Sequence, residues 1–218
     1  GRSGDLRWMV LWAVLGVRAS LRMVPVVGRL ARRVGRVSDA ASDAGDEGSE
    51  GPDGLRDWTV GGAVIEGPAG VLLVRNHRSG GVVDWSPPGG VVDPGEELIE
   101  GLTREVAEET GLVVPRWRGP LYEITCRAPQ LGWCLRVVAF GAEYPGGELS
   151  FNDPDGIVES GDFFHRTACD EPLAGSPQWV REPLVDYLAH RWAEPRRYAY
   201  LIEGTRRSEL RVTRSEHR

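Results

Sequence analysis

Apolar and polar residues follow two different rhythms along this chain, and the change of rhythm predicts a mixture of strands and helices. Short runs rich in apolar and β-branched residues, bounded by glycine and proline, are typical of strands. The turn at Gly67–Gly70 separates the first two of these runs. The stretch Asn76–Pro88 carries turn-forming and charged residues, which predict a loop. The predicted strands cover residues 58–65, 71–75, 89–92, about 119–126, 133–142 and 157–165.

The clearest helix is predicted over Glu97–Thr110. Leu98, Leu102 and Val106 recur there at every fourth position, so they form one apolar stripe. Gly111 follows as a typical residue for ending a helix. The remaining predicted elements are a second helix at 178–192 and a C-terminal hairpin made of 198–202 and 210–212.

The distribution of charge divides the chain into segments. Residues 1–37 contain eight arginines and one acid, whereas residues 38–54 contain six acids and no base. The acidic stretch has no large apolar side chain to bury, so we expect it to be disordered. The predicted division is a basic extension at 1–37, an acidic linker at 38–56, a folded domain at 57–193 and a C-terminal hairpin or tail at 194–218.

The basic extension leaves three interpretations open. Its apolar run, Trp8–Val17, is too short to span a bilayer but could lie as a helix on an anionic membrane surface. The same run could belong to an export signal, because Arg2 and Arg7 precede it. The extension could equally be a poorly structured terminus without a partner.

Composition excludes several classes of protein. The chain has 218 residues, 41% hydrophobic residues and a net charge of −6, which argue against a polytopic membrane protein and against a general nucleic-acid binder. Its three cysteines show no C-x-x-C spacing, so we expect reduced thiols, no disulfide framework and a cytoplasmic location. All 26 basic residues are arginines, so any phosphate clamp must be built from guanidinium groups.

The first predicted helix gathers acidic residues on one face. Glu105, Glu108 and Glu109 stand at i, i+3 and i+4, which places their Cβ atoms about 5–6 Å apart. Such carboxylates repel one another, and Mg²⁺ would offset the repulsion because it prefers oxygen ligands and keeps waters for substrate phosphates. Arg104 could hold one of these carboxylates in orientation. Taken by itself, the cluster could also be a solvated acidic face.

These acids belong to a longer pattern. Gly90 is followed after five residues by Glu96, and after seven more by the run Arg-Glu-Val-Ala-Glu-Glu-Thr-Gly-Leu at 104–112. The pattern resembles the Nudix signature at every fixed position, and the lead-in Trp85–Gly90 resembles that family's aromatic-x-x-Pro-Gly-Gly approach. One departure is Gly101, where many members carry alanine.

The resemblance implies a fold, an activity and a metal. The fold would be α/β (α+β), a Nudix-type α/β/α sandwich around a mixed sheet. The activity would be hydrolysis of a nucleoside diphosphate linked to another group X, with Mg²⁺ or Mn²⁺ as cofactor. Carried onto this chain, Glu105, Glu108 and Glu109 would bind the metal, and Gly90 would add a backbone carbonyl.

The same resemblance implies roles for further residues. Arg104 would orient a signature glutamate, either Glu96 or Glu105. The general base varies across the family. We favour Glu105, and the alternative is an acid outside the signature, Glu159 or Asp155. Each of those two could also be an ordinary surface acid.

Contacts with the substrate are less clearly marked. Arg75 and Arg78, at the end of the second strand, could clamp a phosphate or simply be solvated. Trp133 and Trp117 could stack on a base, although tryptophan is more often a core residue.

The expected partner is a small nucleotide: a nucleoside triphosphate, ADP-ribose or a nucleotide sugar. We therefore expect a Mg²⁺-dependent pyrophosphohydrolase. The alternative function is a non-catalytic Nudix-like module that binds or senses a nucleotide. Modules of that kind usually lose signature carboxylates, and all of them are present here.

Overall fold

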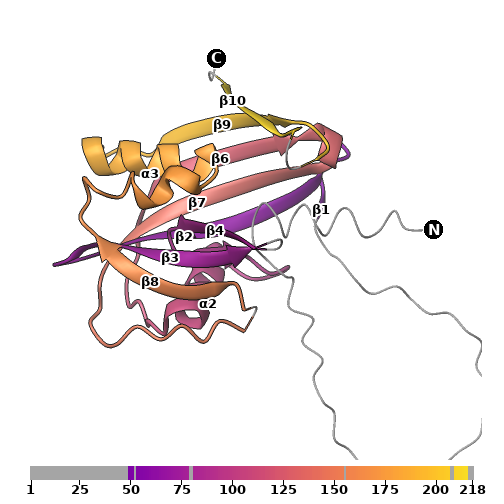
Figure 1. Cartoon of the computed structure of the whole chain (residues 1–218). Coiled ribbons are helices and arrows are strands. Elements are labelled where there is room, and N and C mark those ends of the chain that lie inside the picture. The colour runs from indigo at the N-terminus through magenta and orange to yellow at the C-terminus, as the bar shows by residue number, and fades with distance from the viewer. Residues whose placement is uncertain (1–48, 52, 79–80, 155, 207–208, 216–218) are drawn as a thin grey trace, which may run out of the picture.

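A mixed sheet forms the centre of the computed structural model, which describes residues 49–51, 53–78, 81–154, 156–206 and 209–215 (Figure 1). The strands are β1 (Ser49–Glu50), β2 (Arg56–Gly67), β3 (Gly70–Arg78), β4 (Val82–Ser86), β5 (Gly89–Val91), β6 (Arg118–Ala128), β7 (Trp133–Glu143), β8 (Val158–Phe164), β9 (Arg196–Glu203) and β10 (Arg211–Ser215). They run in the order β10-β9-β6-β7-β2-β3-β4, while β1 and β5 pair with β2 and β8 pairs with β3. The pairs β2–β7 and β6–β9 are parallel, and the other pairs are antiparallel.

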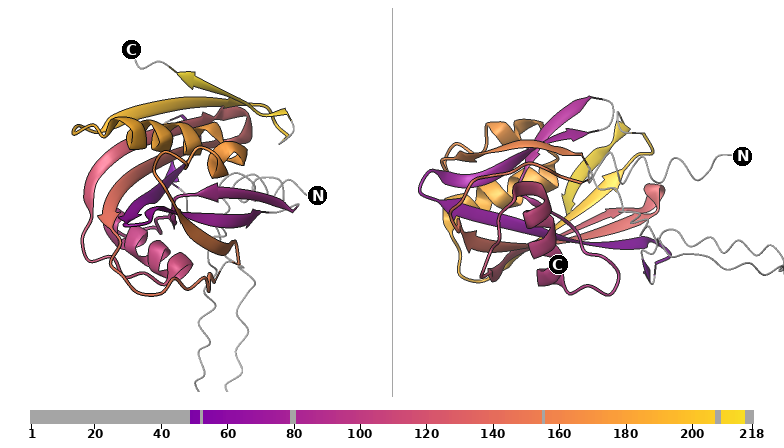
Figure 2. Two further views of the ribbon diagram at one scale, coloured as in Figure 1. Left: turned by 60° about the vertical axis from the view of Figure 1, so that its left-hand side comes forward. Right: turned by 90° about the horizontal axis from the view of Figure 1, so that it is seen from below.

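Two helices cover opposite faces of this sheet, as Figures 1 and 2 show: α2 (Leu98–Thr110) and α3 (Gln178–His190). The alternation of side chains along β2 explains why both faces are apolar, because Ala63 and Ile65 pack on the α2 side and Val64 packs on the α3 side. Short 3₁₀ segments lie at Pro129–Leu131 and Pro172–Gly175. The predicted α/β/α sandwich around a mixed sheet is confirmed.

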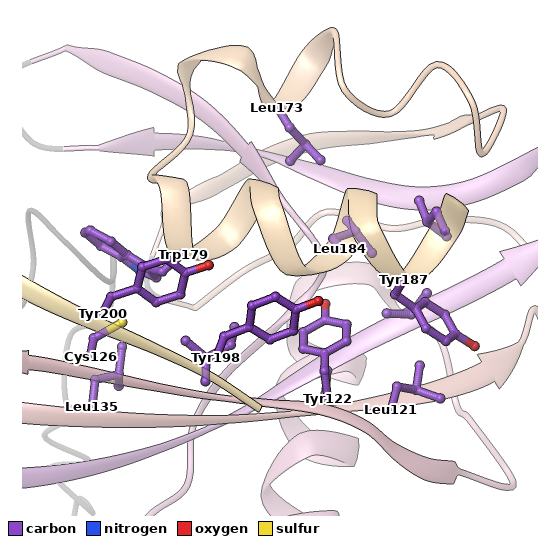
Figure 3. Packing of buried hydrophobic residues seen from close by; sticks show 14 of the residues in the cluster. Leu121, Tyr122, Cys126, Leu135, Leu173, Trp179, Leu184, Tyr187, Tyr198 and Tyr200 are labelled. Atoms are coloured by element: carbon purple, nitrogen blue, oxygen red, sulfur yellow. The ribbon is translucent and has the colours of Figure 1, made fainter. Parts of the chain in front are cut away.

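The core under α3 is built largely from aromatic rings (Figure 3). Tyr122 of β6 lies 6.2 Å from the ring of Tyr187 on α3 and 6.3 Å from the ring of Tyr198 on β9. Leu184 and Trp179 of α3 are buried in the same cluster. Ring pairs at these distances add to the apolar burial that docks α3 onto β6 and β9.

The core under α2 confirms the predicted apolar stripe. Leu102 and Val106 are fully buried, whereas Ile99 beside them is exposed. Gly111 adopts φ +72° and its N–H donates to the carbonyl of Ala107, which ends the helix where the sequence predicted. The carboxylate face of α2 therefore has a fixed orientation relative to the sheet.

The loop predicted over Asn76–Pro88 is wrong in part. The strand β3 continues to Arg78, and residues 82–86 form the antiparallel strand β4 against it. Asn76, Arg78 and Asp84 are buried, and the first two each donate a hydrogen bond to Asp84, which satisfies these polar groups without exposure to solvent.

The predicted C-terminal hairpin is confirmed by the antiparallel pairing of β9 and β10. Its first strand also continues the central sheet, because β9 lies parallel to β6. The basic extension and most of the acidic linker lie outside the described residues, although residues 49–50 of that linker form β1 and Arg56 begins β2. No helix in the described ranges is long and apolar enough to cross a membrane.

Candidate active site

The loop before α2 begins with the short strand β5, which passes very close to β2 at Gly89. This residue has φ +138°, and a Cβ atom there would lie 2.2 Å from the carbonyl oxygen of Gly61 on β2. Only glycine fits such a backbone approach without a clash. The N–H of Gly89 donates to Oε2 of Glu109 at 2.8 Å. The loop and the last turn of α2 are thereby joined.

Arg104 is the centre of the signature. Its Nε and Nη2 donate to the two carboxylate oxygens of Glu96 at 3.0 and 2.9 Å, which is a bidentate contact. Its Nη1 donates to Glu105 at 2.6 Å and to Glu108 at 3.3 Å. Its Nη2 also reaches the carbonyl of Val91 at 3.1 Å. One guanidinium therefore links three signature glutamates to the loop.

The surroundings shift the pKa values of Glu96, Arg104 and Glu109. Hydrogen bonds from Arg104 lower the pKa of Glu96 below its ordinary value, and the same bonds raise the pKa of Arg104. Burial raises the pKa of Glu109 well above its ordinary value. The bond from Gly89 opposes that rise, and repulsion from Glu105 adds to it. Glu109 is thus a carboxyl group that a cation would stabilise in its charged form.

Gly90 lies directly against Glu105. A Cβ atom at Gly90 would be 2.3 Å from Oε2 of Glu105, so any side chain there would displace the carboxylate. Glycine at this position leaves the Glu105 carboxylate in contact with the loop backbone.

The oxygen donors of the signature match the chemistry of a divalent cation. Glu105, Glu108 and Glu109 supply carboxylate oxygens on one helix, which are the ligands that Mg²⁺ and Mn²⁺ prefer. Within the described residues, no three acidic, histidine or cysteine side chains are gathered closely enough to form a ready-made metal cage. Arg104 binds two of the three carboxylates instead. The residues fit the cation by donor type.

A comparison with protein families decides the identity of this arrangement. The model of the NUDIX domain matches residues 55–186, which is more than half of the chain. The chain belongs to the Nudix family. The matched range contains β2 to β8 and both helices up to Asp186.

Curated relatives match this Nudix chain over shorter stretches. The m7GpppN-mRNA hydrolase NUDT17 of Bos taurus is 41% identical over 72 residues, which cover 30% of this chain and 24% of the relative. The asymmetrical bis(5′-nucleosyl)-tetraphosphatase of Mus musculus is 32% identical over 75 residues, which cover 31% of this chain and 51% of the relative. The chain thus spans a quarter to half of the length of these relatives.

Solved structures agree with the fold. A MutT protein of Methanosarcina mazei Go1 superposes with a TM-score of 0.52 at 20% identity, covering 62% of this chain and 94% of its own. A NUDIX hydrolase of Nitrosomonas europaea gives 0.53 at 17% identity, covering 67% and 79%. At these identities the likeness concerns the fold.

Glu159, a candidate general base outside the signature, binds Arg75, a candidate phosphate ligand. Arg75 and Glu159 form an ion pair between β3 and β8, and both side chains are more than one third exposed. Neither makes a contact with a signature glutamate within the described part of the chain. The other outside candidate, Asp155, lies outside the described residues.

The structure places the two tryptophans in the core instead of at a stacking surface. Trp133 is 3% exposed in the cluster under α3, so of the two alternatives the structure favours a core residue. Trp117 packs against the core under α2 and donates its indole N–H to Thr103 at 2.9 Å. Both positions follow from the ordinary preference of large apolar rings for burial.

Two site residues differ from what the sequence predicted. Arg78 is not a solvated strand end, because it is 8% exposed and bound to Asp84. Asp153, which the sequence analysis did not select, is close enough to Glu109 to raise the pKa of that carboxyl by repulsion, after burial and Glu105. Its Oδ2 accepts the N–H groups of Ile157 and Val158 at 2.7 and 2.9 Å.

A groove of about 590 Å³ lies elsewhere, along the outer side of α3. Its acids already have partners, since Asp170 binds Arg181 and Glu182 binds Arg214. No signature residue lines it. The candidate active site is therefore the carboxylate face of α2 and the loop that joins it.

Proposed function

We propose that this chain is a divalent-metal-dependent hydrolase that cleaves the pyrophosphate bond of a nucleoside diphosphate linked to another group. The supporting observation is the complete signature held in one network, with Arg104 binding Glu96, Glu105 and Glu108 while Glu109 binds the Gly89 backbone. A structural remnant of the family would not need to keep three glutamates around one arginine and a fourth on the Gly89 backbone.

The roles of the residues follow from their positions. Glu105, Glu108 and Glu109 are proposed to hold Mg²⁺ or Mn²⁺, which when bound supplies charge neutralisation and a more acidic water. Glu96 orients Arg104 through both of its oxygens. Glu105 contacts the loop at Gly90 and is our proposed general base.

The nature of X is proposed from the relatives. The names of the two curated relatives denote an mRNA cap and a bis(5′-nucleosyl) tetraphosphate, in which a polyphosphate chain joins nucleosides. Those activities belong to proteins that this chain matches only in part. They support our inclusion of dinucleoside polyphosphates, together with nucleoside triphosphates, ADP-ribose and nucleotide sugars, among the proposed substrates.

Cleavage yields a nucleoside monophosphate and either pyrophosphate or X-phosphate. The phosphate-release screen that tests the proposal therefore adds inorganic pyrophosphatase for triphosphates and alkaline phosphatase for the other substrates. The purified full chain is incubated with these substrate classes in Mg²⁺, in Mn²⁺ and in EDTA. We expect turnover of at least one class that requires metal and falls at least about 100-fold in Glu109→Gln. Glu143→Gln, an exposed acid at the end of β7, is the control. Nucleotide binding without turnover in any metal would support the sensor module instead.

We also propose that the basic extension contacts an anionic membrane surface. The support is eight arginines beside one acid in residues 1–37, since basic segments bind anionic lipid. Flotation with vesicles containing phosphatidylserine compares the full chain with a chain starting at Leu55. Equal flotation of the two proteins would rule the contact out.

A further inference from the structure

An arginine and an aspartate form a buried ion pair in the hairpin beside the signature. Nε of Arg78 on β3 donates to Oδ2 of Asp84 on β4 at 2.6 Å. The two side chains are 7% and 5% exposed. Burying both charges costs several kcal/mol of solvation, and their attraction offsets this only with good geometry and further hydrogen bonds.

The amide of Asn76 fixes Asp84 in place and is itself held by the hydroxyl of Ser86. Nδ2 of Asn76 donates to Oδ1 of Asp84 at 3.0 Å and to Oγ of Ser86 at 2.9 Å. Both oxygens of the aspartate are thus occupied, one by Arg78 and one by Asn76. The aspartate is a rigid anchor for the guanidinium.

One face of this hairpin lies on the same side of the sheet as α2. Side chains alternate along β3, so Asn76 and Arg78 share a face with Leu72, which packs in the core under α2. Three residues after Ser86, the chain reaches Gly89, whose N–H binds Glu109. Arg78 is also close enough to Glu109 for their opposite charges to attract each other.

Two nitrogens of the Arg78 guanidinium have no hydrogen-bond partner in the described ranges. Within the described ranges, Nε makes the only hydrogen bond of Arg78, and Nη1 and Nη2 have no partner. Nη1 and Nη2 are not among the side-chain nitrogens that are both inaccessible to solvent and without a hydrogen-bond partner. Since they have no partner, they are accessible to solvent. A buried arginine that keeps two donors without partners in the described ranges, close to a proposed metal ligand, is suited to binding a phosphate oxygen.

We propose that Arg78 contacts a phosphate of the substrate through Nη1 and Nη2 and that Asp84 positions it. This inference rests on the proposed function and adds a residue outside the signature to the site. The arrangement selects for a guanidinium, because a planar fork can bind Asp84 with one edge and the substrate with another. A lysine ammonium at this position could not serve both partners in the same geometry.

Three variants test the proposal. Arg78→Lys keeps the charge but loses the fork. The double variant Arg78→Met with Asp84→Leu replaces the buried pair by apolar side chains, an exchange that buried pairs often tolerate without loss of stability. Arg136→Lys is the matched control, because Arg136 also pairs with an acid across two strands, Glu123, but at the surface.

The measurements separate binding from chemistry. We expect KM to rise at least about tenfold in Arg78→Lys and further in the double variant, with a smaller change in kcat and no change in Arg136→Lys. The Kd for the α,β-methylene analogue of ATP in Mg²⁺, measured by calorimetry, should rise in parallel. Thermal unfolding establishes that the double variant is folded.

The outcomes distinguish this inference from the proposed function. A folded double variant with the parent's KM and Kd would show that the pair is structural only and would overturn the inference. That result would leave metal-dependent turnover and its loss in Glu109→Gln untouched. Conversely, if Glu109→Gln retained turnover, the metal-ligand assignment would fail even though Arg78 bound the analogue.

Discussion

Glu109 accepts a hydrogen bond from the backbone N–H of Gly89 at 2.8 Å, across 20 residues of sequence. The last acid of α2 is therefore positioned by the loop that precedes the helix. Because Gly89 in turn lies against the carbonyl of Gly61, the position of this carboxylate depends on contact between the loop and β2. Stability and the proposed catalytic activity should consequently be coupled at this point.

Gly89→Ala should destabilise the protein and reduce turnover together. Alanine disfavours a positive φ, which costs on the order of 1–2 kcal/mol of folding free energy. Its Cβ would also clash with the carbonyl oxygen of Gly61. Gly95→Ala is the control, because Gly95 has φ +82° with open space around its Cβ position. Denaturant unfolding of both variants should show a loss for Gly89→Ala that exceeds the loss for Gly95→Ala. Equal losses would contradict the close approach.

Arg104→Lys should lower both the free energy of unfolding and the turnover. Lysine cannot reproduce the bidentate contact with Glu96 while also reaching Glu105. We expect a loss of roughly 1–3 kcal/mol in the free energy of unfolding. Arg181→Lys provides the comparison, since Arg181 binds both oxygens of Asp170 at the surface and should lose less. A larger loss in Arg181→Lys would refute the central role of Arg104.

The Arg104–Glu96 contact also predicts how stability depends on pH. Arg104 lowers the pKa of Glu96 below its ordinary value of 4.5. A lowered folded-state pKa contributes stability that is complete above the unfolded value and is lost as pH falls through the folded value. The difference in unfolding free energy between the parent and Arg104→Gln should therefore shrink below about pH 4.5. Denaturant titrations at pH 7 and at pH 3 measure it, and an unchanged difference would argue against the contact.

Gly101→Ala should raise the free energy of unfolding by less than helix propensity alone predicts. Alanine gains roughly 1 kcal/mol over glycine inside a helix. Here its Cβ would lie 2.8 Å from Oε2 of Glu96 and 3.2 Å from Cγ2 of Val92. A double-mutant cycle with Glu96→Ala measures the conflict, because the gain should return once that carboxylate is removed. Additive effects in the cycle would disprove the conflict.

The sequence was sufficient for the parts of the site that are local. The carboxylates of α2 share one helical turn, and the apolar stripe of Leu98, Leu102 and Val106 fixes which face they occupy. The spacing between Gly90 and Glu105 likewise belongs to one continuous segment. For such features, periodicity and the signature contain the geometry.

The sequence was insufficient where burial depends on distant partners. Charged residues at a strand end normally predict exposure, and only the pairing of β3 with β4 reveals that Arg78 and Asp84 bury each other. Trp133 could equally have been a core residue or a stacking surface, and the packing of β7 against the cluster under α3 decided it. Asp153 is placed by the path of its loop, for which the sequence offers only turn-forming residues around Pro154 and Gly156.

Asp153→Asn tests whether that loop acid acts on Glu109. Asparagine keeps an oxygen that can accept the N–H groups of Ile157 and Val158, so the loop should keep its path. The variant removes one negative charge near Glu109, and the pKa of Glu109 should fall toward its ordinary value while burial still keeps it raised.

The change should appear in two measurements. A raised carboxyl pKa means that the metal-free folded protein loses stability as pH rises from the unfolded value toward the folded one, so Asp153→Asn should reduce this loss. If Glu109 must be ionised to bind metal, the acid limb of kcat/KM at subsaturating Mg²⁺ should move to lower pH. Asp162→Asn, an exposed acid on β8, should move neither. An acid limb that moved upward or stayed in place in Asp153→Asn would remove Asp153 from the site.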